Sequence, residues 1–401
     1  MGKVKERSLL VLAVTAAIVF LFLGFSFCFA QSKTERPIKL GFVNMRTGFG
    51  SIHALHAYRA VKMAVDEVNE RGGLLGRELI LIEEDSHTEV DLGLQKLEKL
   101  IKQDKVAATV VFVFSHILQA QLEMANSNKH ILLGGGLNEG TFCSHYLFGT
   151  YAQPNQWVYP IMDWAAKEVG KRVYLVGSDY AWGRGSLEAA KRHLPEIGAT
   201  LVGEEYYPLG TTDWAPAIQK IKDAKPDWIL PMVAGNDYVV LLKQFFDFGL
   251  KDEIIVANTI FNEEDSPAFP PDVRDGLMTV ATYFTTLDTP ENNVFVKELR
   301  RRFGKDVIMT NFGEAYYDMV HMWVKAVEKA KTTDSEAVIK ALETQGPFKA
   351  PQGEIKIDPK THTYVMNTYL GRVNSDGKIE VEKSLGQVFP KTEVKCDARK
   401  P

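Results

Sequence analysis

The sequence lacks the short motifs that mark the common enzyme classes. It contains no G-x-S-x-G nucleophile turn, no H-E-x-x-H metal-binding helix and no Walker phosphate loop. Two glycine pairs, Gly48-x-Gly50 and Gly183-x-Gly185, each lack the third glycine of the dinucleotide-binding fingerprint. These absences favour a binding protein over an enzyme, and they predict neither a cofactor nor a metal.

Basic clusters and cysteines are also scarce. The formal net charge is −4, and the one basic cluster, Arg300-Arg301-Arg302, is expected to be a solvated helix end. A nucleic-acid partner is therefore not expected. Two of the three cysteines, Cys143 and Cys396, lie beyond the N-terminal segment. They either form a disulfide that ties the tail to the first half of the protein or stay unpaired, and the sequence leaves both outcomes open.

Residues 1–30 have the composition of an export signal. Three basic residues precede an apolar run from Leu9 to Phe27, and Cys28-Phe29-Ala30 offers small residues before a cut at Gln31. We expect cleavage after about Ala30 and a periplasmic protein. The apolar run is also long enough to span a bilayer, so a retained membrane anchor is the alternative.

Strands and helices alternate along the rest of the chain. Apolar strands are expected at Ile38–Asn44, Arg77–Glu83, Ala107–Phe114 and His130–Gly134, with helices between them. The helix after the first strand carries Leu55, Tyr58, Val61, Val65 and Val68 at helical spacing and ends at Gly72-Gly73. The same rhythm restarts after Phe148–Gln156, a stretch rich in Gly, Pro, Asn and Gln. We therefore predict an α/β protein with two doubly wound parallel-sheet lobes facing each other across a cleft.

Ligand contacts are expected in turns that follow sheet strands, where helix N-termini meet the cleft. Tyr180, in the turn between the strand Arg172–Val176 and the next helix, is the best candidate to stack on a ligand. Ser115 is expected to cap a helix and to contact the ligand as well. The full set of candidate ligand-binding residues is Ser115, His116, Gly135, Gly136, Leu137, Tyr180, Gly235, Asn236, Asp237 and Thr259.

Two groups of ionisable residues are expected to lie on the surface. His53 and His56 stand three residues apart at the start of a helix, and two histidines alone do not make a metal site. Glu263, Glu264 and Asp265 are interpreted as an exposed acidic loop.

Several longer motifs are similar to those of a known family. They include A-x-x-x-V-N-E-R-G-G-L-L-G-R at 64–77, A-Q-P-N-Q at 152–156, V-G-S-D-Y at 176–180, A-K-P-D at 224–227, D-T-P-E-N at 288–292 and A-P-Q-G-E-I-K-I-D at 350–358. The chain thereby resembles the periplasmic solute-binding proteins of branched-chain amino acid and amide ABC importers. Within them it looks most like the urea- and short-chain-amide-binding branch.

The resemblance implies a type I periplasmic binding protein fold with a three-crossing hinge near 149–154, 284–290 and 346–352. The implied division is a signal peptide at 1–30, an N-terminal lobe at 37–150 and 287–346, a C-terminal lobe at 151–286 and 347–385, and a tail at 386–401. It also implies a monomeric receptor that closes on a small-molecule ligand and delivers it to the membrane subunits of an ABC permease.

The ligand class follows from departures from the family pattern. Amino-acid binders place an acid for the ligand's ammonium where this chain has Thr259, and an aromatic residue where it has Gly235. The absence of that acid argues against leucine-like ligands, unless Asp237 or Glu263 provides the carboxylate for the ammonium instead. The amide binders carry Tyr and Thr at the positions of Gly134 and Gly136, so we expect a wider pocket here, for a larger amide or a carboxylate. A ligand-sensing ectodomain or an amide-responsive regulator of the same fold is the alternative function.

Overall fold

The computed structural model describes residues 36–135 and 138–400. The helices and strands lie within one compact unit, Ile38–Pro401. The predicted signal peptide, residues 1–30, lies outside the described residues. Within the described ranges, no helix is both long and apolar enough to cross a membrane.

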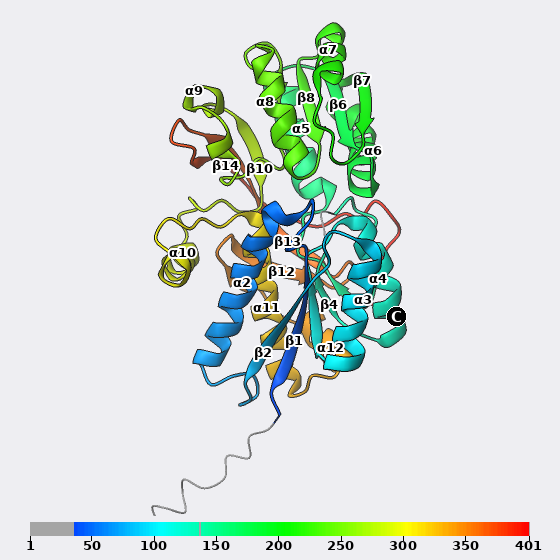
Figure 1. Ribbon diagram of the computed structural model, residues 1–401, viewed down its shortest axis with the longest axis vertical. Helices are drawn as coiled ribbons and strands as arrows, with labels where there is room; N and C mark the ends of the chain where they lie inside the picture. The colour runs from blue at the N-terminus through cyan, green and yellow to red at the C-terminus, as the bar shows by residue number, and fades with distance from the viewer. Residues whose placement is uncertain (1–35, 136–137, 401) are drawn as a thin grey trace, which may run out of the picture. The chain divides into compact units, whose positions relative to one another are not determined.

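The first lobe is built on a five-stranded parallel sheet with the order β2-β1-β3-β4-β5. Figure 1 shows its strands flanked by α2 and α11 on one side and by α3 and α4 on the other. Its strands are β1 (Ile38–Asn44), β2 (Leu79–Asp85), β3 (Ala108–Val111), β4 (Leu132–Gly134) and β5 (Leu147–Phe148). Its helices are α2 (Ser51–Glu70), α3 (Val90–Lys99) with a π turn at Leu100–Asp104, α4 (Ser115–Asn128), α10 (Pro290–Phe303), α11 (Asn311–Ala330) and α12 (Ser335–Glu343).

Helix α2 shows where the sequence pattern was right and where it was wrong. Val61, Val65 and Val68 are buried as predicted, but Leu55 is 47% exposed, because the buried stripe is completed by small alanines that let α11 pack closely. The helix ends at Glu70, and Gly73 follows with φ +82°. A Cβ at Gly73 would lie 2.0 Å from the Arg77 carbonyl oxygen, so only glycine fits this turn.

The second lobe repeats the design with a four-stranded parallel sheet in the order β7-β6-β8-β9. Its strands are β6 (Arg172–Ser178), β7 (Thr200–Tyr207), β8 (Trp228–Met232) and β9 (Ile255–Val256). Its helices are α5 (Pro154–Glu168), α6 (Ala181–Ile197), α7 (Ala215–Ala224) and α8 (Asn236–Asp247), followed by a 3-10 turn (Ser266–Ala268) and the short α9 (Pro271–Arg274).

The C-terminal strands form a separate antiparallel sheet with the order β10-β13-β12-β11, and β14 pairs with β13. These strands are β10 (Met278–Ala281), β11 (Phe348–Ala350), β12 (Gly353–Asp358), β13 (Thr363–Val373) and β14 (Ile379–Val388). Parallel bridges join this sheet to both lobes: Gly149 pairs with Thr363, and Asn258 pairs with Thr279. The sheet is therefore shared by the two lobes rather than added to the second.

Three of the family-like motifs place one buried polar side chain at each predicted hinge crossing. The Gln156 amide donates to the carbonyl oxygens of Tyr364 (2.9 Å) and Val388 (2.8 Å). The Asn292 amide donates to the carbonyl oxygens of Thr285 and Leu287. Gln352 donates from its backbone N–H and its side-chain amide to the Glu314 carboxylate, each at 3.0 Å. These bonds tie the three motifs to neighbouring backbone carbonyls and, for Gln352, to a buried carboxylate.

The C-terminal tail contacts both lobes. Glu393 accepts from the Tyr159 hydroxyl (2.8 Å) and from Arg192 (2.7 Å) of the second lobe, and its N–H donates to the Gly140 carbonyl oxygen (2.8 Å) of the first. Cys396 is joined to Cys143 of the first lobe by a disulfide with a Cα–Cα distance of 5.6 Å. We call residues 389–398 the strap.

Candidate functional site

Three helices begin directly after a strand, at the sheet edges where the lobes meet. Helix α4 begins at Ser115 after β3, α6 at Ala181 after β6, and α8 at Asn236 after β8. Because the carboxyl ends of parallel strands share one edge of a sheet, the N-termini of these helices gather there. Helices α4 and α6 contact each other across the lobes.

Aromatic rings from both lobes meet at this edge. Phe114 and His116 of the first lobe lie 5.6 and 5.8 Å from Tyr180 of the second, measured between ring centroids. Phe49, from the loop before α2, lies 6.0 Å from Phe114. We call Phe49, Phe114, His116 and Tyr180 the aromatic cluster. Its spacing is that of interacting aromatic pairs, so rings of the two lobes pack directly on one another at this edge.

The aromatic cluster also contains buried polar atoms without a protein partner. His116 Nδ1 and the Tyr180 hydroxyl are both buried and make no hydrogen bond. Burial lowers the pKa of His116 and raises that of Tyr180 well above its usual value, so both groups are neutral near pH 7. A buried polar atom left unpaired costs free energy. These two atoms are therefore positioned to bond a ligand held between the rings.

Ser115 is positioned differently from the sequence prediction. It is the first residue of α4 rather than its N-cap, which is Phe114, and no side-chain cap bond is formed. The Ser115 hydroxyl instead donates to a Glu139 carboxylate oxygen at 2.8 Å. Glu139 in turn packs against Gly185 of α6, where an added Cβ would lie 2.7 Å from Glu139 Cγ. The Ser115–Glu139 pair thus forms part of the surface on which the second lobe rests.

The first-lobe loop that carries Gly134 and Gly135 is more closely packed than predicted. A Cβ at Gly134 would lie 2.4 Å from the Tyr316 ring, whose hydroxyl donates to the carbonyl oxygens of Val111 (2.9 Å) and Gly135 (2.6 Å). The space at Gly134 is therefore filled by Tyr316, and the expected widening of the pocket at this position is wrong. Gly136 and Leu137 lie outside the described residues.

The predicted residues of the second lobe separate into two groups. Gly235, with φ +60°, faces the first lobe: an added Cβ would lie 2.9 Å from the Phe49 ring. Asn236 is exposed at the start of α8. Asp237 and Thr259 bond within their own lobe. Asp237 accepts from the Gly210 N–H at 2.7 Å, and the Thr259 hydroxyl donates to the Met232 sulfur at 3.5 Å.

The predicted exposed acidic loop is buried. Glu263 and Asp265 are 6% and 4% exposed, and burial raises the pKa of each carboxyl to about 7. Glu264 forms ion pairs with His53 and His56 of α2, so the expectation that these histidines lie on the surface is also wrong. The loop is buried because the first two turns of α2 cover it from the opposite lobe, and His53 and His56 there pair with the Glu264 carboxylate.

Several residues at the cleft were missed by sequence reasoning. Phe49 lies in the turn that follows β1, the kind of position in which ligand contacts were expected, but nothing in the sequence distinguishes this residue from its neighbours. Phe114 reads as the last apolar residue of a strand. The pairing of Glu264 with His53 and His56 joins residues more than 200 positions apart, and a single sequence gives no signal for such a pair.

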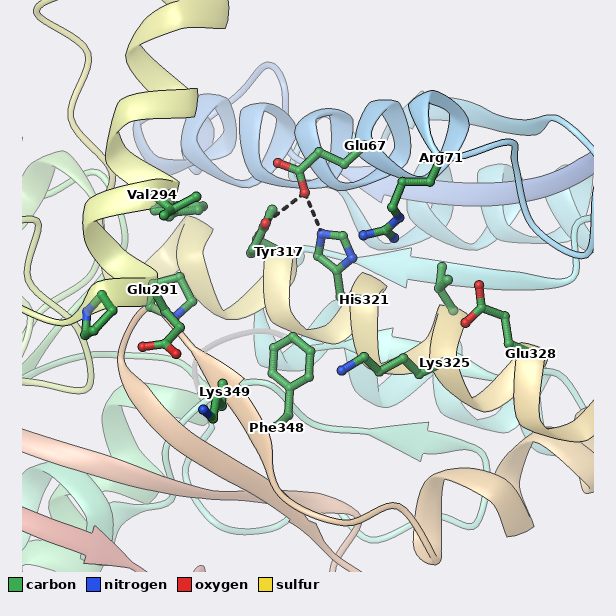
Figure 2. A pocket seen from close by; sticks show the side chains of 14 residues that line it. Glu67, Arg71, Glu291, Val294, Tyr317, His321, Lys325, Glu328, Phe348 and Lys349 are labelled. Carbon is green, nitrogen blue, oxygen red and sulfur yellow. Dashed lines mark hydrogen bonds and ion pairs between the residues drawn. The ribbon is translucent and has the colours of Figure 1, made fainter.

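A separate groove of about 620 Å³ lies on the outside of the first lobe, between α2, α10, α11 and β11 (Figure 2). Its central acid, Glu67, already accepts from the Tyr317 hydroxyl (2.8 Å) and from His321 (3.0 Å). Arg71 and Lys325 lie at its rim. Among the residues that the structure describes, no group of three or more His, Cys, Asp or Glu is placed to hold a metal ion.

Comparisons with known proteins agree with this architecture. Leu/Ile/Val-binding protein homolog 6 of Brucella melitensis is 28% identical over 222 residues, which cover 53% of this chain and 56% of the relative. The chain thus matches only about half the length of that relative. A solute-binding protein of an ABC transporter from Rhodopseudomonas palustris, solved in complex with 3,4-dihydroxybenzoic acid, is 25% identical with a TM-score of 0.77, covering 90% of this chain and 99% of that one.

A second solved structure shares the fold. The branched-chain amino acid transporter substrate-binding protein of Streptococcus pneumoniae, in complex with isoleucine, has a TM-score of 0.76 at 22% identity and covers 88% of this chain and 100% of that one. These relatives are substrate-binding proteins rather than enzymes, and none of the comparisons singles out the urea and amide branch. Residues 37–378 match the family described as periplasmic binding protein, and with its two parallel-sheet lobes the chain belongs to that family, with the type I fold of ABC transporter substrate-binding proteins.

Proposed function

We propose that this protein is the exported receptor of an ABC importer and that it captures a small aromatic carboxylate between its lobes. The observation that carries the proposal is the aromatic cluster, in which rings from both lobes surround two unpartnered neutral groups, His116 Nδ1 and the Tyr180 hydroxyl. A neutral tyrosine donates to a carboxylate, and the rings pack on an aromatic ring.

The acids around the cleft argue against an amine ligand. Most of their oxygens are already engaged with protein groups: Glu139 with Ser115 and Thr141, Asp237 with Gly210, Glu263 with Thr285, Glu264 with His53 and His56, and Asp265 with Asn262. Glu263 keeps one buried oxygen, Oε2, without a hydrogen-bond partner, but burial raises the pKa of this carboxyl to about 7 and so favours its neutral form. The ammonium of an amino acid enclosed without a carboxylate partner would lose its hydration uncompensated. This supports a carboxylate, or an uncharged amide, over leucine-like ligands.

The comparison with the Rhodopseudomonas protein supports the same ligand class, since that neighbour was solved with a dihydroxybenzoic acid. In our proposal the lobes close by rotation at crossings near 149–154, 284–290 and 346–352, and the closed form docks on the membrane subunits of a permease. We further propose that the signal segment is removed after about Ala30 and that the receptor works as a monomer.

The test is a thermal-shift screen followed by calorimetry. The panel comprises benzoate, 4-hydroxybenzoate, 3,4-dihydroxybenzoate, leucine, isoleucine, urea and acetamide. A ligand at a hundredfold excess over Kd stabilises the native state by about 2.7 kcal/mol, which is readily seen as a rise in melting temperature.

Variants then locate the site. Tyr180→Phe removes a hydrogen bond to a charged group, worth about 1.5–3 kcal/mol, and should weaken benzoate binding by about 10- to 150-fold. Tyr317→Phe is the matched control, because its hydroxyl bonds Glu67 in the outer groove. A response to leucine or isoleucine and none to the benzoates would contradict the proposal, as would equal binding by wild type and Tyr180→Phe.

A further inference from the structure

An ion cluster joins the two lobes beside the cleft. His53 and His56 lie in the first two turns of α2, and Glu264 lies in the loop after β9 of the second lobe. One Glu264 oxygen pairs with His53 Nδ1, and the other lies 2.5 Å from His56 Nε2. One carboxylate thereby bridges two histidines that belong to the opposite lobe.

The cluster is almost sealed from water. The side chains of His53, His56 and Glu264 are 15%, 9% and 10% exposed. The ring of Phe312 from α11 packs on His53 with a centroid distance of 4.4 Å. A carboxylate this deeply buried is stable only with its partners, and these partners are present only when the lobes are together.

We propose that His53, His56 and Glu264 form an ionic clasp that fastens the closed form and couples ligand capture to the uptake of a proton. The clasp depends on the proposed function in one respect, namely that closure of the lobes retains a captured ligand. Its effect on closure itself needs no ligand. Opening the lobes would expose Glu264 and both histidines to water and separate the carboxylate from both rings.

The direction of the coupling follows from the charges. Burial opposes the positive charge of His53, but the Glu264 carboxylate outweighs it and raises the pKa of His53. Burial likewise opposes the charge of Glu264, and the two histidines lower its pKa to about 2. A raised histidine pKa stabilises the closed form below the pKa of the open form, and this contribution is lost as pH rises through the closed-form value. The stabilising contribution of the lowered Glu264 pKa is complete above about pH 4.5 and is lost only as pH falls below that value, so the pH dependence near neutral pH comes from His53.

Other ionisable groups face the clasp from the elements packed around it. Glu263 and Asp265 flank Glu264 in the same loop, and burial raises the pKa of each to about 7. Tyr151 and Tyr238, whose pKa values are raised well above their ordinary values by burial, are neutral throughout the relevant range. Ionisation of the two flanking acids above about pH 7 adds negative charge beside Glu264.

The experiment measures the distance between the lobes without a ligand. Spin labels on cysteines introduced by Glu123→Cys in α4 and Lys222→Cys in α7, both exposed positions, report the closed fraction by double electron–electron resonance. We expect the closed fraction of the otherwise wild-type protein to be larger at pH 5.5 than at pH 8.5. We expect Glu264→Gln to lower it at pH 5.5 and to remove the pH dependence, and the pair His53→Asn with His56→Asn to do the same.

A matched carboxylate–histidine pair serves as the control. Glu67 and His321 bond at 3.0 Å entirely within the first lobe, so Glu67→Gln should leave the closed fraction and its pH dependence unchanged. Circular dichroism and the melting temperature check that each variant is folded. An equal closed fraction in wild type and Glu264→Gln at pH 5.5, or a pH dependence that survives in Glu264→Gln, overturns the clasp.

Calorimetry with benzoate adds the second readout. In wild type, benzoate binding at pH 7.5 should take up protons, which is seen as a dependence of the binding heat on the ionisation enthalpy of the buffer. As pH rises, affinity for benzoate should fall by at most about tenfold per pH unit. If benzoate does not bind while the distance between the lobes still depends on Glu264 and on pH, the clasp is supported and the proposed ligand is contradicted. If benzoate binds with no proton uptake, the coupling part of the proposal is wrong.

Discussion

Replacement of Gly185 by alanine should separate ligand affinity from fold stability. Gly185 lies in α6 of the second lobe, and an added Cβ would lie 2.7 and 2.8 Å from Cγ and Cβ of Glu139 in the first. Glu139 is not free to retreat, because it is buried and its carboxylate accepts from Ser115 (2.8 Å) and Thr141 (3.0 Å). The clash exists only while the lobes are together.

The two expected effects have opposite signs. Overpacking by one methyl group costs about 1–3 kcal/mol. Because that cost falls on the closed form alone, affinity for the captured ligand should drop by about 5- to 150-fold. In the open form the methyl group is harmless, and alanine stabilises a helix interior by up to about 1 kcal/mol relative to glycine. The melting temperature of the ligand-free protein should therefore stay constant or rise.

Calorimetry and thermal unfolding test this together. Gly93→Ala in α3 is the control, because an added Cβ would lie 2.9 Å from Ile117 Cγ2 of the same lobe. Its cost falls on the open and closed forms alike, so it should lower the melting temperature and leave ligand affinity unchanged. Unchanged affinity in Gly185→Ala would show that Glu139 and Gly185 are not in contact when ligand is held. Both measurements are made at pH 8.5, where the clasp is expected to be weak. A large loss of melting temperature in the ligand-free protein at that pH would show that the lobes are closed without a ligand, and either result refutes the reasoning.

Three further predictions concern stability. Gln156→Leu leaves two hinge carbonyls without their donor and should lower the free energy of unfolding by about 2–5 kcal/mol, measured by urea titration. Cys396→Ser releases the strap and should destabilise the protein by at most about 5 kcal/mol. Faster proteolysis of the tail is the local readout. If neither the stability nor the proteolysis rate changes, the Cys143–Cys396 disulfide is contradicted. His130 is buried against the Thr109 hydroxyl, and burial lowers its pKa to about 4. Because the unfolded state binds this proton more readily, wild type should lose up to about 3 kcal/mol between pH 6.5 and 4 relative to His130→Leu, and parallel pH profiles would contradict this.

The regular elements were predictable because their signals are local. Strand β1 has the predicted bounds. The start of α12 is also set locally, because the Asp334 carboxylate accepts from the Ala337 N–H at 3.0 Å. Helix α10 carries a weaker local signal, because it is mostly polar and buries only Asn292, Phe295 and Leu299.

The site was predictable only in part, for a related reason. The turns that carry Ser115, His116, Tyr180 and Gly235 follow from the alternation of strands and helices. What fills the space between these turns depends on contacts across the cleft. The ring that lies beside Gly235 comes from Phe49 of the opposite lobe, and such contacts leave no trace in a single sequence.

The disulfide constrains the order in which the molecule can be completed. Cys396 is synthesised 253 residues after Cys143, about 10–50 s later at ordinary rates of translation. Helices α11 and α12, which cover the first sheet, also arrive late, whereas the second lobe from α5 to β9 is one contiguous stretch. The second lobe can therefore fold to completion while the first still waits for its outer helices and for the partner of its thiol. The part of the chain that begins folding first is the last to be finished.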